Sequence, residues 1–223
     1  MALLPGLTVQ TVRPMPTLPP EIDARIEAIW QARLALQPRL FNGRVFTAEQ
    51  VRAGRIAGHW SEYRRVLAQM TQPELFKVLR LNPLAVNGVL HTPDGTVLGR
   101  REAGSTYLAG CWHTPPAGSV ESRLGEDDVD LNRQILAEAE EELGLPPALL
   151  TVHGPFRAVR HPGTRIVDIG IRLSTDLPFA DVRHHWKETG NGEYDALAVV
   201  PRGREAEWTA RADLLPGARL FLM

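Results

Sequence analysis

The sequence predicts a mixed α/β fold in which an acidic helix packs against a sheet. Three stretches carry this prediction. Residues 127–146 have the pattern of one helix with both ends marked. Val86 to Arg101 has the pattern of a β-hairpin around Pro93-Asp94-Gly95, and Arg165 to Leu173 alternates apolar and polar side chains as a half-buried strand does. The chain, at 223 residues, is long enough for one domain of about 140 residues and an accessory segment.

The N-terminal residues predict such an accessory segment, 1–79, ahead of a main domain, 80–223. Prolines exclude a regular helix over residues 1 to about 20, so we expect an extended arm there. A helix is expected from Pro20 and should end before Pro38. Val45 to Trp60 predicts two strands around Ala53-Gly54, with a helix interrupted by Gly54 as the alternative. Tyr63 to Met70 predicts a short helix.

Two further strands are expected after the acidic helix. Phe156 to Arg160 predicts a short strand, followed by a turn at His161-Pro162-Gly163. Ala196 to Val200 is an apolar run that stops at Pro201, and it predicts the last strand of the sheet.

The acidic helix has capping signals at both ends. Asp127, Asp128 and Asp130 supply an N-cap and an acidic first turn, whereas Gly144 is typical of the position after a helix and Pro146 blocks continuation. Ile135, Leu136, Ala139 and Leu143 recur at three- and four-residue spacings. They therefore predict one apolar stripe facing the sheet.

Three carboxylates gather on another face of the same helix. Glu138, Glu141 and Glu142 stand at positions i, i+3 and i+4 in the last turns, where the helix dipole disfavours negative charge. A solvated acidic face is the alternative interpretation. We instead predict a site for a hard divalent cation, Mg²⁺ with Mn²⁺ as a substitute, because such ions take oxygen ligands from carboxylates, substrate phosphates and water.

A strand and loop precede this helix and end in Pro116-Ala117-Gly118-Ser119-Val120-Glu121. Gly118 could bring its backbone carbonyl close to the same cation. Together, loop, glycine and helix resemble the Nudix box, G-x5-E-x7-R-E-U-x-E-E-x-G-U, whose second half matches residues 137–145 here. The match departs from the family at Ala137, which replaces the arginine, and at the small Ala139. In addition, Gly118 precedes Glu138 by 20 positions (138 − 118), where the family has 15.

The resemblance implies an α/β/α sandwich: a mixed, curved sheet with the box helix on one face and a C-terminal or N-terminal helix on the other. It also implies metal-dependent hydrolysis of the pyrophosphate in a nucleoside diphosphate linked to another moiety. Glu138, Glu141, Glu142 and the Gly118 carbonyl would hold the metal. Glu188 or Glu138 would act as the base, because family members often carry such a glutamate in the loop before the last strand; Glu193 ranks second to Glu188.

Specificity is predicted from weaker signals. Arg101, Arg160 and Arg165 are candidates for binding the second phosphate, because a guanidinium pairs with phosphate oxygens through two hydrogen bonds. Trp30, Arg33, Pro38 and Leu40-Phe41-Asn42-Gly43 resemble the Nudix branch that hydrolyses UDP-glucose and UDP-galactose, which also has a lengthened box loop. This resemblance implies a UDP-sugar that is cleaved to UMP and a sugar 1-phosphate. The N-terminal segment offers Trp30, Phe41 and Phe46 for packing against such a substrate, and Asn42 for hydrogen bonding.

Other functions stay open at this point. ADP-ribose or a CoA derivative could be the substrate, or the chain could be an inactive Nudix-fold binding module, since the box arginine is missing unless Arg133 or Arg123 replaces it. An isomerase acting on isopentenyl diphosphate would need Cys111 as its catalytic cysteine, but the rest of that branch's pattern is not evident.

Composition excludes several classes. The formal net charge of −1 gives no electrostatic footprint for nucleic acid. One cysteine cannot form an internal disulfide, which favours a reducing cytoplasm. The N-terminus lacks a signal-peptide pattern, and no apolar run reaches membrane-spanning length, so we expect no membrane partner. The expected partner is a small nucleoside diphosphate derivative, and the sequence is compatible with a homodimer. His184 and His185 lack the ligand spacing of a zinc site.

Overall fold

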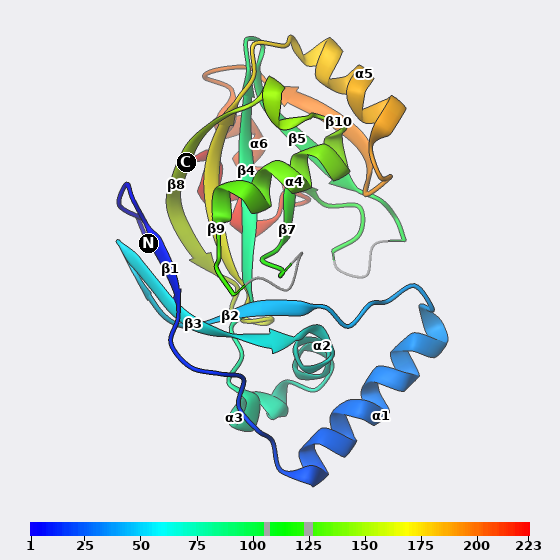
Figure 1. Ribbon diagram of the computed structural model, residues 1–223. Helices are drawn as coiled ribbons and strands as arrows, with labels where there is room; N and C mark the ends of the chain where they lie inside the picture. The colour runs from blue at the N-terminus through cyan, green and yellow to red at the C-terminus, as the bar shows by residue number, and fades with distance from the viewer. Residues whose placement is uncertain (105–107, 123–126) are drawn as a thin grey trace.

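The computed structural model describes residues 1–104, 108–122 and 127–223 (Figure 1). The N-terminal part of the chain forms β1 (Thr8–Thr11), α1 (Pro20–Leu36), β2 (Arg44–Arg52), β3 (Arg55–Glu62), α2 (Tyr63–Thr71), the 3-10 turn η1 (Pro73–Leu75) and α3 (Phe76–Leu79). The remainder forms β4 (Leu84–Thr92), β5 (Gly95–Arg101), β6 (Trp112–His113), β7 (Ala117–Ser119), α4 (Leu131–Leu143), the 3-10 turn η2 (Pro147–Leu149), β8 (Thr151–Arg160), β9 (Val167–Ser174), α5 (Phe179–Thr189), β10 (Tyr194–Val200), α6 (Glu205–Thr209) and α7 (Pro216–Leu222).

Two sheets organise the chain. The larger has strand order β10-β5-β4-β9-β8, with β6 paired to β5 and β7 paired to β4. It is mixed, because β4 runs parallel to β9 while its other pairings are antiparallel. The smaller sheet has the order β1-β3-β2, with β1 parallel to β3.

Helices cover both faces of the larger sheet (Figure 1). On one face, α4 lays Ile135 and Leu143 into the main core, where Ile169 and Ile171 of β9 are also fully buried. On the other face, α7 approaches so closely that a Cβ on Gly170 of β9 would lie 2.7 Å from the ring of Phe221. The predicted α/β/α sandwich around a mixed sheet is therefore confirmed, and a C-terminal helix covers the far face.

The small sheet shares the main core of the molecule. Leu3, Phe46, Ile56 and Trp60 are buried in the same apolar cluster as the box helix and the large sheet. The first residues also join β8 directly: Met1 and Ala158 exchange two backbone hydrogen bonds of 2.8 Å. Removing residues 1–79 would therefore open the core of the rest. The predicted boundary between an accessory segment, 1–79, and a main domain, 80–223, stays a prediction.

Most of the predicted elements are present. The hairpin at 86–101, the two strands around Ala53-Gly54 and the helices starting at Pro20 and Tyr63 are confirmed. Two expectations were wrong in detail. The acidic helix starts at Leu131 and not in the aspartate run, because Asp130 is the cap that accepts from the backbone N–H groups of Asn132 and Arg133. The arm contains β1, whose backbone pairs with the free edge of β3.

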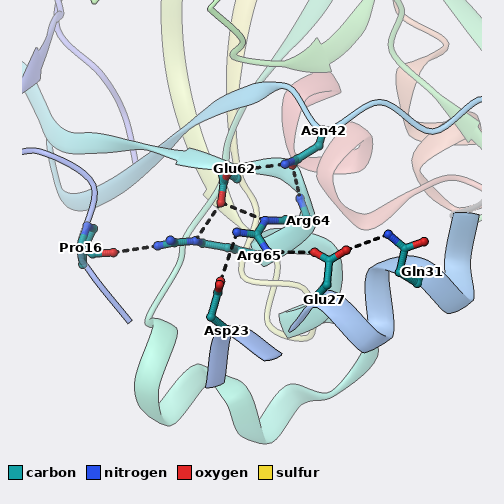
Figure 2. Close-up of polar contacts among 8 residues, drawn as sticks. All are labelled: Pro16, Asp23, Glu27, Gln31, Asn42, Glu62, Arg64 and Arg65. Carbon is teal, nitrogen blue, oxygen red and sulfur yellow. Dashed lines mark hydrogen bonds and ion pairs between the residues drawn. The ribbon is translucent and has the colours of Figure 1, made fainter. Parts of the chain in front are cut away.

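A polar network joins α1 to the start of α2 (Figure 2). Arg64 bridges Asp23 and Glu27 of α1 and also binds Glu62, with N–O distances of 3.1 Å in all three pairs. Arg65 donates to Glu62 and to the carbonyl of Pro16 in the arm. The Arg64 side chain is 17% exposed, and its loss would remove a cation that pairs with three partly exposed carboxylates.

No helix among the described residues is both long enough and apolar enough to cross a membrane.

We predict that Arg64→Ala lowers the free energy of unfolding by about 1–2 kcal/mol, because it removes one charge that pairs with three partly exposed carboxylates. Arg39→Ala, at an exposed position between α1 and β2, is the matched control and should change it by less than about 0.5 kcal/mol. Urea unfolding followed by circular dichroism measures both. Equal, small effects of the two variants would show that the network does not fix α1.

Candidate functional site

The acidic helix is fixed at both ends. Asp130 caps its N-terminus through hydrogen bonds of 2.9 and 3.0 Å. Gly144 ends it in the left-handed conformation, with φ of 65°, and a Cβ there would lie 1.9 Å from Oγ1 of Thr189. Glycine is therefore needed both for the backbone turn and for the close approach of α5.

Glu138 lies directly against the glycine of the preceding loop. It is buried in α4, and an ideal Cβ on Gly118 would lie 2.3–2.5 Å from its carboxyl atoms. Only a residue without a side chain lets β7 and this carboxylate meet. The structure therefore brings together two of the residues predicted to hold a metal.

The carboxylate of Glu142 is buried and half satisfied. Its Oε2 accepts from the backbone N–H of Ala117, at 2.9 Å, and from the hydroxyl of Tyr194, at 2.5 Å. Its Oε1 is buried and has no hydrogen-bond partner among the residues that the structure describes. Burial raises the pKa of Glu142 well above its usual range, and the nearby charges of Glu193 and Glu138 raise it further. A buried carboxylate oxygen without a hydrogen-bond donor is a suitable ligand for a cation.

Glu141, the third predicted carboxylate, is placed differently. Its side chain is exposed, while its backbone carbonyl accepts from Asn191 at 3.0 Å. One shared face of three carboxylates was expected. Instead, Glu138 and Glu142, one turn apart, are buried, whereas the side chain of Glu141 is exposed to solvent.

The residues present fit a divalent cation that is completed by its substrate. Across the three described ranges, no three His, Cys, Asp or Glu side chains surround a common cation position. Two observations nevertheless favour a cation: the unpartnered Oε1 of Glu142 and the glycine cradle that holds Glu138. Mg²⁺ commonly uses one or two carboxylates and takes its other ligands from phosphates and water. Glu138 and Glu142, with the carbonyl of Gly118, suit that pattern.

Gln134 holds the carboxylate of Glu138. Its amide donates to Oε1 of Glu138 at 2.5 Å from one helical turn away, and its own oxygen accepts from the backbone N–H of Glu121. A neutral amide thus orients the carboxylate. Ala137 is half-buried, Arg133 has an exposed side chain, and Arg123 lies outside the described residues.

Of the two glutamates predicted in the loop before the last strand, one lies in a helix. The helix α5 continues through Thr189, so Glu188 is an exposed helical residue and not part of the loop assigned to it. The physical reason is that α5 packs its last turn against the end of α4, where Gly190 and Gly144 allow close approach. Glu193 is in the loop, pairs with Arg101 at 2.8 Å, and is close enough to Glu142 to raise its pKa.

Of the three predicted arginines, only Arg101 lies at this site. Arg160 is on β8, an edge strand two places away from β4, and lines a hollow with Met1 and Glu49. Arg165 lies over the ring of Phe76 in α3, 4.3 Å from its centroid. Strand order therefore separates the three candidates, and Arg101 alone among them lies beside the buried carboxylates.

Sequence analysis missed Tyr194 and His113. Both are buried, and their ring centroids lie 5.3 Å apart beside Glu142. Burial and the charge of Arg101 lower the pKa of His113 to about 3, so the ring is neutral at physiological pH. No sequence signal marks either residue, because their approach to Glu142 depends on how β5, β6 and β10 pair.

We predict that Gly118→Ala weakens Mn²⁺ binding by about 10-fold or more while the fold is retained, because the new methyl group displaces the flexible carboxyl end of Glu138. Gly54→Ala is the control, since a Cβ there would meet Leu4 at an ordinary 3.7 Å. Isothermal titration with Mn²⁺ and thermal unfolding measure the two effects separately. Unchanged Mn²⁺ affinity in Gly118→Ala would remove Gly118 and Glu138 from the metal site.

Several solved structures resemble this chain. The MutT protein from Methanosarcina mazei Go1 is 20% identical with a TM-score of 0.47, and covers 63% of this chain and 89% of its own. The Nudix hydrolase RenU from M. smegmatis is 20% identical with a TM-score of 0.43, at 63% and 81% coverage. An Ap4A hydrolase from C. elegans is 16% identical with a TM-score of 0.44, at 63% and 92%. No protein-family model and no curated protein sequence matches this chain.

Proposed function

We propose that this protein is a metal-dependent hydrolase that cleaves the pyrophosphate bond of a nucleoside diphosphate linked to a second moiety. The observation that carries the proposal is the buried, unpartnered Oε1 of Glu142 beside the Gly118–Glu138 contact. A carboxylate oxygen in that position costs stability unless it serves a cation. The resemblance of residues 137–145 to the Nudix box supports the same chemistry.

The bound metal would neutralise diphosphate charge and lower the pKa of an attacking water. Glu138 and Glu142 would hold it, together with the carbonyl of Gly118. Arg101 would bind phosphate oxygens, because its guanidinium lies 2.8 Å from Glu193 beside the buried carboxylates and can pair with a phosphate through two hydrogen bonds. The oxygen of water bonds to one phosphorus and the bridging P–O bond breaks, which yields two phosphate monoesters.

Glu193 is the better placed of the two loop-side glutamates to take the proton from water. It lies near Glu142 and is oriented by Arg101, whereas Glu188 is exposed on α5. Glu138 remains a candidate for the same role. A general base must reach the water that binds at the metal, and proximity to the buried carboxylates favours Glu193.

As the finer substrate class we propose a UDP-sugar, cleaved to UMP and a sugar 1-phosphate. The lengthened box loop supports it, because described residues on both sides of this loop contact the N-terminal sheet. Phe46 donates to the carbonyl of Val120 at 2.8 Å, and Trp60 donates through Nε1 to the carbonyl of Asp127 at 3.0 Å. The N-terminal sheet, which follows the residues that resemble the UDP-sugar branch, thus contacts the chain on both sides of this loop.

The aromatic residues expected to hold the substrate are not all available. Phe46 is buried in the main core, and Trp30 is buried with its ring edge-on to Tyr63. The amide of Asn42 is occupied by Glu62 and the backbone of Arg64. Only Phe41 is freely exposed, at 80%. Specificity would then come from the hollow at the start of α4, which is lined by Glu121, Ser122, Asp128, Asp130 and Arg133, among others.

We predict turnover of a UDP-sugar in a Mg²⁺-supplemented screen of nucleoside diphosphate sugars, dinucleotides, CoA and ADP-ribose, with the products identified by mass spectrometry. Glu142→Gln should lower kcat by at least about 10²-fold, since it removes the charge at constant shape. Glu140→Gln, at an exposed position of the same helix, is the matched control and should retain activity.

Turnover of ADP-ribose or a CoA derivative without UDP-sugar turnover would overturn the finer proposal only. No turnover of any diphosphate, together with ligand binding, would indicate a binding module and overturn the hydrolase.

We also predict that Glu193→Gln lowers kcat by about 10² to 10⁴-fold and Glu188→Gln by much less, as the loss of a general base would. Steady-state kinetics at saturating Mg²⁺ compares the two variants. A larger loss in Glu188→Gln would restore the order that the sequence first indicated.

A further inference from the structure

Tyr194 is held rigidly between two strands beside the box helix. Its ring lies so close to Gly99 of β5 that a Cβ there would be 2.7 Å from the ring. The ring of His113, paired with Gly99 through β6, lies on it at 5.3 Å between centroids. The pairing of β10 with β5 shifts register just after Tyr194, and such bulges re-aim side chains. The ring therefore crosses β5 toward α4.

The hydroxyl of Tyr194 ends at the carboxylate of Glu142. It donates to Oε2 at 2.5 Å, and the N–H of Ala117 donates to the same oxygen at 2.9 Å. Two donors on one oxygen fix the plane of the carboxylate and leave Oε1 free. Tyr194 is itself 3% exposed, so water does not compete readily for this bond.

We infer that Tyr194 is a positioning residue for the metal: its hydroxyl fixes the side chain of Glu142 so that Oε1 faces the cation. The inference rests on the proposed function and deepens it. A partner that orients a metal ligand typically contributes 10- to 100-fold to metal affinity or activity. Without the hydroxyl, Ala117 alone would hold the carboxylate, and binding a cation would first have to order it.

The test is Tyr194→Phe, which removes one oxygen and keeps the ring packed on Gly99 and His113. We expect Mn²⁺ affinity, measured by titration without substrate, to fall about 10- to 100-fold. The Mg²⁺ concentration for half-maximal turnover should rise to match, with kcat at saturating Mg²⁺ close to that of the wild type. Tyr63→Phe is the control, because it makes the same change in a ring that packs edge-on against Trp30 in the N-terminal segment.

Each outcome decides the inference. Equal Mn²⁺ affinity in Tyr194→Phe and wild type, with only a lower melting temperature, would overturn it and leave the hydrolase intact. A wild-type protein that binds no Mn²⁺ would overturn it along with the metal site. Mn²⁺ binding without turnover of any diphosphate would sink only the hydrolase, and the titration would still decide the role of Tyr194.

A second measurement covers the case in which Tyr194→Phe does not fold. Binding of Mg²⁺ to the wild type should shift the tyrosine ultraviolet absorption, because the charge on Glu142 next to the Tyr194 hydroxyl changes its environment. The same shift should persist in Tyr63→Phe. A wild-type protein that binds Mg²⁺ with no such shift would overturn the inference.

Discussion

The burial of Glu142 is the constraint on which the centre of this molecule depends. A carboxylate removed from water costs several kcal/mol unless donors or a cation compensate it. Here the donors come from two separate strands, β7 through Ala117 and β10 through Tyr194, while the carboxylate comes from α4. Three segments must be in register before this side chain is satisfied, so the constraint ties the helix to the sheet at one point.

The same constraint explains the electrostatics of the site. Glu138 and Glu193 lie near enough to Glu142 to raise its pKa, and Arg101 is the cation paired with Glu193. Ionising all three carboxylates together is unfavourable because their negative charges repel one another. A bound divalent cation would instead favour their ionised forms. Gln134 fits this arrangement, because an amide orients Glu138 without adding a positive charge that would compete with a metal.

The N-terminal segment acts as a support for the box loop. Its sheet buries Phe46 and Trp60 in the main core, and both residues also donate to loop carbonyls that precede α4. Arg44 adds an ion pair to Asp127 and lies over the ring of Trp60. These contacts offset part of the conformational entropy that the described residues ahead of α4 lose on folding.

The sequence alone determined the local elements and the chemistry of the helix. Periodicity predicted the two hairpins and a helix within residues 127–146, because the apolar spacing that buries one face is a property of the local sequence. The prediction that carboxylates gather one turn apart was equally local. Even so, the aspartate run did not show which residue caps, since all three aspartates have the same capping chemistry.

Only the tertiary structure decided which of those carboxylates are buried and what they meet. Glu141 and Glu142 are neighbours in the chain, but one is exposed and the other is 1% exposed. Arg101, Arg160 and Arg165 looked equivalent until strand order separated them. Likewise, Tyr194 is not part of any sequence motif. Its hydroxyl reaches Glu142 because β10 pairs with β5, because a bulge follows Tyr194, and because Gly99 has no side chain to block the ring.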